Sequence, residues 1–151
     1  MIALEPIGHV RGGRTEPVDD AWGDVECDIE LAPAFDASAF TGLDAFSHAL
    51  VIFQFHLVDP AKVTTGARRP RGNPEWPLAG IFAQRGSPRP NRLGATSVPI
   101  VRLAGRRLRV LGLDAVDGTP VLDVKPEMSG FRPRGELREP DWARAIMRDY
   151  W

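Results

Sequence analysis

Hydrophobic and polar residues alternate most regularly between residues 48 and 57. This period of two is typical of a β-strand, in which successive side chains point to opposite faces. One face holds Ala49, Val51, Phe53, Phe55 and Leu57, and the other holds His48, Leu50, Ile52, Gln54 and His56. The first face is wholly apolar and is expected to pack in a core. The polar residues of the second face could line a ligand pocket or bond to neighbouring backbone near a barrel rim.

Short apolar segments elsewhere predict further strands at 2–10, 25–31, 80–83, 96–103, 107–113 and 121–124. The chain contains 15 glycines and 14 prolines, which divide it into short pieces and favour strands and turns over long helices. Ala104 and Gly105 are expected to join two strands in a hairpin. This number of short strands predicts a mainly all-β fold, either a small barrel or a sandwich.

Two segments break the strand pattern. Residues 59–77 contain four prolines and no apolar period, so we expect a long exposed loop there. Residues 139–151 are expected to form a helical tail, because Pro140 suits a first turn and Trp142, Ile146 and Tyr150 follow at a spacing of four. The aromatic stripe of this helix is expected to dock on the barrel or on a second subunit.

The length of 151 residues fits one domain, residues 1–151. Cys27 is the single cysteine, so no internal disulfide can form, and a reducing, cytoplasmic compartment is expected. No apolar run approaches the length of a membrane span, so no membrane partner is expected. The three histidines and Cys27 lack metal-ligand spacing, and no metal site is expected.

The near-neutral net charge of −1 conceals an uneven distribution. Residues 1–60 carry eleven acids and two arginines, whereas residues 61–109 carry eleven bases and a single acid, Glu75. A basic middle third could attract an anionic partner such as nucleic acid. It could equally pair with the acidic first third, within one chain or across a dimer.

The segment from Gly80 to Gly94 leads from a short apolar stretch into a loop with three arginines, Arg85, Arg89 and Arg92. Three guanidinium groups cannot be buried without partners, so this loop does not belong to a packed core. Prolines hold its backbone stiffly, and arginine forks presented in this way suit a carboxylate or a phosphate. A solvated surface loop explains the composition equally well.

Three segments, 42–56, 80–94 and 113–126, together resemble the TsaA-like (TrmO) family of S-adenosylmethionine-dependent methyltransferases. Their sequences are GLDAFSHALVIFQFH, GIFAQRGSPRPNRLG and LDAVDGTPVLDVKP. The resemblance covers about residues 4–127 and implies a small single-sheet β-barrel that forms a homodimer. It implies S-adenosylmethionine (SAM) as methyl donor, bound near the subunit interface. The implied substrate is threonylcarbamoyladenosine, next to the anticodon of tRNA, methylated at N6.

The resemblance also implies which residues bind the donor. Arg85 matches a family arginine and could hold the donor carboxylate or an RNA phosphate. Residues 117–123 match a turn and strand whose backbone reads the adenine edge, while an aspartate there balances the sulfonium or binds ribose. The implied donor-binding residues are Asp20, Trp22, His56, Leu57, Arg85, Ala95, Asp117, Gly118, Thr119, Pro120, Val121 and Asp123.

Methyl transfer is an in-line displacement, so positioning should supply much of the rate. A carbamoylated adenine nitrogen is a poor nucleophile, and a group that removes or orients its proton would help. His56, Asp117 and Asp123 are the catalytic candidates. The residues expected to contact RNA are Arg68, Arg69, Arg71, Arg89, Asn91 and Arg92; for the first three we expect little neutralisation by local partners.

The chain departs from the family pattern at Gln84, Gly86 and Glu127. Glu127 stands where an aromatic residue usually follows Lys-Pro, and a glutamate cannot stack on a base. Two other functions therefore stay open. One is a methyltransferase with a small-molecule or different RNA acceptor, and the other is a donor-binding protein without turnover.

Overall fold

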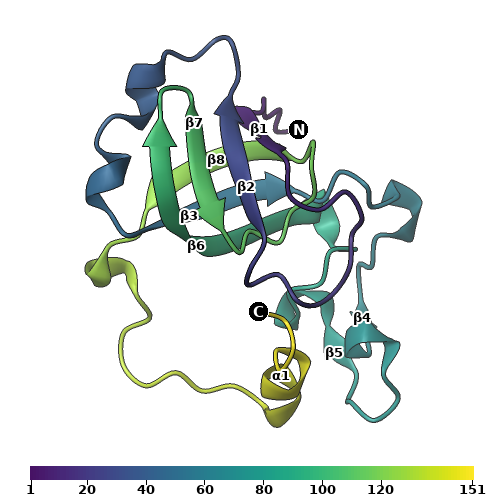
Figure 1. The fold of residues 1–151 in the computed structure, drawn as a ribbon. Coiled ribbons are helices and arrows are strands. Elements are labelled where there is room, and N and C mark those ends of the chain that lie inside the picture. Colours follow the sequence, from purple (N-terminus) through teal and green to yellow (C-terminus); the bar gives the residue numbers. More distant parts are fainter.

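The computed structural model describes residues 1–151, and its main feature is a closed antiparallel barrel with strand order β1-β2-β7-β6-β3-β8 (Figure 1). The strands are β1 (Gly8–Arg11), β2 (Glu26–Leu31), β3 (His48–Gln54), β6 (Leu93–Ala104), β7 (Arg107–Leu111) and β8 (Pro120–Pro126). Closure leaves the barrel without a free edge. The expected mainly all-β, single-sheet barrel is confirmed, as is the hairpin at Gly105, whose φ of +60° suits glycine.

The barrel interior is filled by residues at alternate positions of each strand. Val10, Ile29, Val51, Phe53 and Leu108 are among those with at most 1% of their surface exposed. The expected apolar face of β3 is confirmed at its first three residues. It is wrong at Leu57, which is 56% exposed. The alternation ends because the chain leaves the sheet after Gln54, whose carbonyl accepts a hydrogen bond from the His56 N–H in a tight turn.

Residues 56–92 form a small lobe beside one end of the barrel (Figure 1). The strand expected at 80–83 is mostly wrong: only β5 (Ala79–Gly80) is extended, and a 3-10 turn (Ile81–Ala83) follows, with Ile81 buried as an anchor. The expected long loop contains β4 (Ala67–Arg68), which pairs with β5. Gln84 joins the pair, because its side-chain amide donates to the carbonyls of Arg68 and Ala79, both at 2.8 Å.

The C-terminal segment leaves the barrel through an exposed stretch, residues 129–140, and returns below it (Figure 1). Its helix α1 (Asp141–Ile146) has six residues, shorter than expected and far short of a membrane span. Docking is made chiefly by the residues after the helix. The Ala21 N–H donates to the Asp149 carbonyl at 2.9 Å, and the Trp22 N–H donates to the Tyr150 carbonyl at 2.8 Å.

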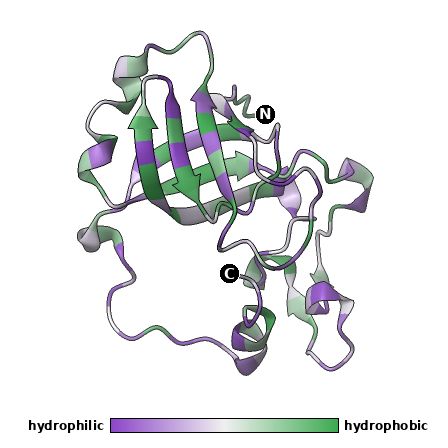
Figure 2. Cartoon of the chain, viewed as in Figure 1, coloured by the Kyte–Doolittle hydropathy of each residue, from purple (hydrophilic) through white to green (hydrophobic).

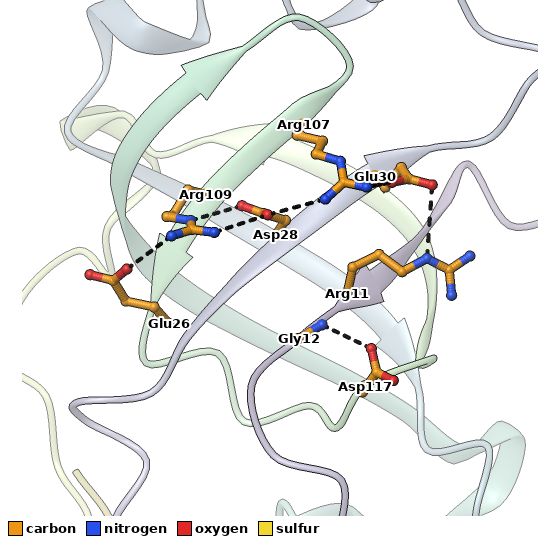
Figure 3. Close-up of polar contacts among 8 residues, drawn as sticks. All are labelled: Arg11, Gly12, Glu26, Asp28, Glu30, Arg107, Arg109 and Asp117. Carbon is orange, nitrogen blue, oxygen red and sulfur yellow. Dashed lines mark hydrogen bonds and ion pairs between the residues drawn. The ribbon is translucent and has the colours of Figure 1, made fainter.

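The two outer faces of the barrel differ in chemistry. On β1, β2 and β7, hydrophilic residues alternate with hydrophobic ones, and the outward carboxylates and guanidiniums form one connected set of ion pairs (Figures 2 and 3). On β3 and β6, the outward positions include Leu50, Ile52, Ala95 and Pro99. The first of these faces confirms that the acidic first third pairs with the basic middle third.

Candidate active site

Three loops meet at the end of the barrel where β1 ends and β6 and β8 begin: residues 12–25, 84–92 and 112–119. The Gly12 N–H donates to Asp117 Oδ1 at 2.8 Å (Figure 3), and the Gly112 N–H donates to the Val25 carbonyl at 2.8 Å. These bonds join the first and third loops, although the two are distant in sequence. Most of the donor-binding residues implied by the sequence gather here.

Arg85 lies in the second of these loops and is exposed. Its Nη2 donates to the carbonyl of Ala95 on β6 at 2.5 Å, so two of the implied donor-binding residues are in direct contact. A guanidinium has five N–H donors. The geometry therefore leaves Arg85 able to bind a carboxylate or phosphate from solvent.

Asp114 and Tyr150 lie beside this arginine, and neither was singled out from the sequence. Thr96 Oγ1 donates to Asp114 Oδ1 at 2.5 Å, and the Tyr150 hydroxyl donates to Asp114 Oδ2. Burial and the neighbouring Asp114 carboxylate raise the pKa of Tyr150 well above its ordinary value, against the opposing charges of Arg85 and Arg71. Tyr150 is therefore a neutral hydrogen-bond donor throughout the physiological range. Asp114 lies within the 113–126 motif, but its partner could not be read from the sequence.

Asp20 and Trp22 lie in the first loop and are already engaged. Asp20 accepts a bidentate pair of bonds from Arg71 at 2.8 and 3.1 Å. The indole of Trp22 is 3% exposed and lies beneath Arg14, whose guanidinium carbon is 4.6 Å from the ring centroid. Arg14 also donates to the Asp20 carbonyl at 2.8 Å. The Trp22 ring therefore supports the loop rather than offering an open face to a ligand.

His56 follows β3 at the same end of the barrel. Its pKa is lowered, first by burial of the ring and then by the nearby charges of His9 and Arg92, against a hydrogen bond with the Gln54 backbone. Arg92 braces the turn, because its Nη1 donates to the Val58 carbonyl at 2.8 Å. His56 is therefore a neutral imidazole at pH 7, able to accept a proton. His9 lies on β1, which is separated from β3 by β8, and is a neighbour that sequence reasoning missed.

The turn at residues 117–120 is tightly built into the protein. The N–H groups of Asp117, Gly118 and Thr119 donate to the carbonyls of Arg14, Val10 and Val116 respectively. The Thr119 hydroxyl donates to Val116 O at 2.7 Å, and the Val121 side chain is fully buried in the core. The side chains of Thr119 and Val121 therefore face inward. The backbone of this turn therefore has carbonyl acceptors for a ligand but no free N–H donors. Of the adenine groups that it was expected to bind, only the amino group, a donor, can bond to it.

Asp123 does not join this group. It is opposite Ile52 on the outer face of the sheet, and its Oδ2 is 2.7 Å from Lys125 Nζ. It also lines a cavity of about 470 Å³ near the other end of the barrel, whose walls include Ile7 and Phe40. No hydrogen bond or ion pair links it to His56 or Asp117.

The arginines expected to contact RNA are mostly tied to the lobe. Arg89 Nη1 donates to the Gln84 carbonyl at 2.6 Å, and Arg69 Nη1 to that of Trp76 at 2.5 Å. The expectation that residues 68, 69 and 71 lack local partners is wrong for Arg71, which Asp20 neutralises. Arg68 Nε is buried without a partner. Asn91, the other candidate, is exposed, with a φ of +61°. Carbonyl partners do not cancel charge, so Arg69 and Arg89 keep theirs, and no acid forms an ion pair with Arg68.

Comparison with known proteins places these residues within a family. The model of the tRNA-methyltransferase O N-terminal domain matches residues 17–131. A protein of Pyrococcus abyssi named "Probable S-adenosyl-L-methionine-binding protein" is 34% identical over 91% of this chain and 74% of its own length. The tRNA (adenine(37)-N6)-methyltransferase of Escherichia coli is 38% identical over 64% of this chain and 42% of its own length.

The crystal structure of TrmO from Pseudomonas aeruginosa has a TM-score of 0.73 and 28% sequence identity with this chain. The similarity covers 91% of this chain and 61% of the crystallised one. The chain thus spans about three fifths of that solved relative and less than half of the E. coli enzyme. The match of fold and sequence together shows that the chain belongs to the family of the tRNA-methyltransferase O N-terminal domain.

Proposed function

We propose that the protein is a SAM-dependent methyltransferase that methylates the N6 position of threonylcarbamoyladenosine in tRNA. The observation that carries this proposal is the barrel end at which exposed Arg85 contacts Ala95 and a neutral His56 follows β3, all within the residues that the family model matches. Relatives in E. coli, Mus musculus and Homo sapiens bear the name tRNA (adenine(37)-N6)-methyltransferase.

The residues at this end suit the groups of the donor. The free guanidinium donors of Arg85 match its carboxylate, and the carbonyls of the 117–120 turn match the adenine amino group. When bound, SAM supplies an electrophilic methyl group on a sulfonium. The role of the protein is to hold the methyl group of the donor in line with the acceptor nitrogen, and this positioning can supply much of the rate acceleration.

Among the three catalytic candidates, His56 is favoured as the group that takes the acceptor proton. One carboxylate oxygen of Asp117 is occupied by the Gly12 N–H, and Asp123 lies away from the loops. A base works best when it is unprotonated at the working pH. Replacing His56 with glutamine should lower kcat by about 10²-fold or more while the dissociation constant of SAM changes little. Equal losses in SAM binding would instead make His56 a donor-binding residue.

The cellular test is mass spectrometry of modified nucleosides in tRNA from cells that lack the gene. The N6-methylated form of threonylcarbamoyladenosine should disappear and return when the wild-type gene is supplied, but not with His56→Gln. Unchanged modification would reject this substrate. If SAM is bound and S-adenosylhomocysteine is formed with another acceptor, the enzyme class would stand and the substrate would change. SAM binding without turnover would favour the non-catalytic alternative.

The basic lobe is the part of the chain that we propose to contact tRNA. A double change of Arg68 and Arg69 to alanine should weaken tRNA binding and flatten its dependence on salt, because fewer counterions are released. Arg102→Ala is the matched control, since Arg102 is an exposed arginine of β6 near the other end of the barrel. Identical affinities and salt slopes for both variants would make the lobe an ordinary solvated surface.

We also propose that the protein acts as a homodimer through the outer face of β3 and β6. Ile52 and Ala95 are opposite each other on that face, and Ala95 is also part of the donor-binding group. A second copy seated there would bury Leu50 and Ile52 and would cover the Arg85–Ala95 contact from outside. This arrangement explains why an outward barrel face carries apolar side chains.

A further inference from the structure

Two opposite charges meet the same strand at adjacent residues. Arg85 is bonded to the carbonyl of Ala95, and Asp114 is bonded to the hydroxyl of Thr96, the next residue of β6. Both charged groups also lie close to the Tyr150 phenol. Yet Arg85 and Asp114 form no ion pair with each other, and no lysine, arginine or histidine pairs with Asp114.

Asp114 is half-buried, and its two bonds come from neutral hydroxyl groups. A partly desolvated carboxylate is stabilised most by a cation, which the chain does not supply here. Each carboxylate oxygen has two lone pairs, so each keeps one after its bond to Thr96 or Tyr150. Asp114 can therefore accept further hydrogen bonds from a cationic ligand.

The C-terminus holds Asp114 in this state. The Tyr150 hydroxyl bonds to it, while the backbone of residues 149–150 is bonded to Ala21 and Trp22. Gly23 allows the final residue to come close, since a Cβ at Gly23 would be 2.7 Å from the carbonyl carbon of Trp151. The orientation of Asp114 thus depends on the docked tail as well as on the barrel.

A carboxylate acceptor and a guanidinium with remaining N–H donors, both close to the Tyr150 phenol, together complement a zwitterion, the form of an α-amino acid at neutral pH. We propose that Arg85 and Asp114 together bind the amino-acid end of SAM, the carboxylate on Arg85 and the ammonium on Asp114, with Tyr150 as the positioning residue that orients Asp114. This inference rests on SAM as the donor in the proposed function. It adds Asp114 and Tyr150 to the residues implied by the family resemblance.

The test is calorimetry with SAM, S-adenosylhomocysteine, decarboxylated SAM and 5′-methylthioadenosine. S-adenosylhomocysteine keeps the amino-acid end without the sulfonium charge, and 5′-methylthioadenosine lacks both. Asp114→Asn should weaken the binding of SAM and of S-adenosylhomocysteine by about tenfold or more and leave 5′-methylthioadenosine within about twofold. Arg85→Gln should remove the preference for SAM over decarboxylated SAM. Tyr150→Phe keeps the ring but loses the hydroxyl, and should show the Asp114→Asn pattern more weakly. Asp44→Asn, an exposed carboxylate on the short helical turn before β3, is the matched control.

In Asp114→Asn, equal losses for all four ligands, no loss, or a loss for SAM without one for S-adenosylhomocysteine would overturn the inference. If that variant does not fold by circular dichroism, Tyr150→Phe and the wild-type ranking of the ligands decide the question. Tighter binding of 5′-methylthioadenosine than of SAM by the wild type would contradict the proposed roles of Arg85 and Asp114. If the wild type shows the expected ranking but does not methylate tRNA, the substrate proposal fails and the binding inference stands. If it binds none of the ligands, both fail.

Discussion

The barrel has two outer faces of different chemistry. One, on β1, β2 and β7, is charged, and the other, on β3 and β6, carries apolar side chains. On the first, Arg109 lies between Asp28 at 2.9 Å and Glu26 at 3.6 Å, and Arg107 lies between Asp28 and Glu30 (Figure 3). On the second, Ile52 and Ala95 are directly opposite each other. The charges of the first face are paired with one another, whereas the second face leaves apolar side chains partly exposed to water, which is unfavourable.

This difference shows which arginines keep a positive charge that could attract an anionic partner. Arg107 and Arg109 are neutralised by carboxylates of β2, so they add little to a field that would attract RNA. The arginines of the lobe have mostly carbonyl partners and keep their charge. The net charge of each sequence segment could not distinguish arginines neutralised by carboxylates from arginines bonded only to carbonyls.

The largest expected effect lies beneath both faces, in the shared core. Leu108→Ala should lower the free energy of unfolding by about 2–5 kcal/mol, because Leu108 is fully buried and its loss leaves a cavity. Urea denaturation measures this. Leu111→Ala is the control, since Leu111 is half-buried opposite Glu26 on the outer face and should cost less. Equal losses would mean that the charged face is as important for stability as the core.

Next in size is a charge placed on the apolar face. Ile52→Asp should raise the dimer dissociation constant by about tenfold or more, because an unpaired carboxylate opposite Asp123 of β8 would have to be desolvated in the proposed interface. Analytical ultracentrifugation over a range of concentrations measures the constant. Leu111→Asp places the same charge opposite another acid, Glu26, on the other face and should leave association unchanged. A wild type that is monomeric at high concentration would refute the dimer.

A smaller effect comes from the charged face and depends on pH. A hydrogen bond and charge from Arg109 hold the pKa of Asp28 below its ordinary value of 3.8, with a further contribution from Arg107, against the effect of partial burial. The ionised form is thus favoured in the folded state. Its stabilisation is present above the ordinary carboxyl pKa and is lost as the pH falls through the lower folded value.

Asp28→Asn should therefore unfold at a lower temperature than the wild type at pH 7, and the gap should close as the pH falls below 3.8. Thermal melts over a pH series follow this gap. The loss should be smaller than that of Leu108→Ala, because the partner guanidinium is open to solvent. A gap that stays constant down to the most acidic pH would show that the pairing of the Asp28 charge is not its cause.

The smallest effect is expected at the edge of the same set of ion pairs. Arg11 Nε is 3.8 Å from Glu30 Oε1, and both side chains are partly open to solvent, at 47% and 32% exposure. Arg11→Ala should change the free energy of unfolding by less than about 1 kcal/mol. A larger loss, measured by urea denaturation, would show that the ion pairs act cooperatively.

Most of the barrel could be predicted from local pattern. The alternation in β3 identified Ala49, Val51 and Phe53 as inward residues, and they are buried. The prediction failed where contacts from elsewhere decided the conformation. Residues 81–83 have the composition of a strand but form a 3-10 turn, because Ile81 is buried and its N–H bonds to the Gly66 carbonyl.

The candidate site was predicted less completely. Arg85, His56 and Ala95 could be chosen because motifs of the sequence include them. Asp114 was overlooked within such a motif, since nothing local shows that a carboxylate is held by Thr96 and by a tyrosine 36 residues away. Asp123 was chosen because it lies in the 113–126 motif that resembles the family, but its strand carries it away from the loops.

The sequence by itself determined most strands of the barrel, the buried alternation and the family, because each of these depends on residues near one another in the chain or on motifs of fixed spacing. Only the tertiary structure decided which charged side chains are neutralised by ion pairs. Asp20 and Arg71 are 51 residues apart and neutralise each other, while Arg85 and Asp114 both lie close to Tyr150 and form no ion pair. Charge pairing depends on distances of a few ångströms, and barrel closure sets those distances by joining strands remote in sequence.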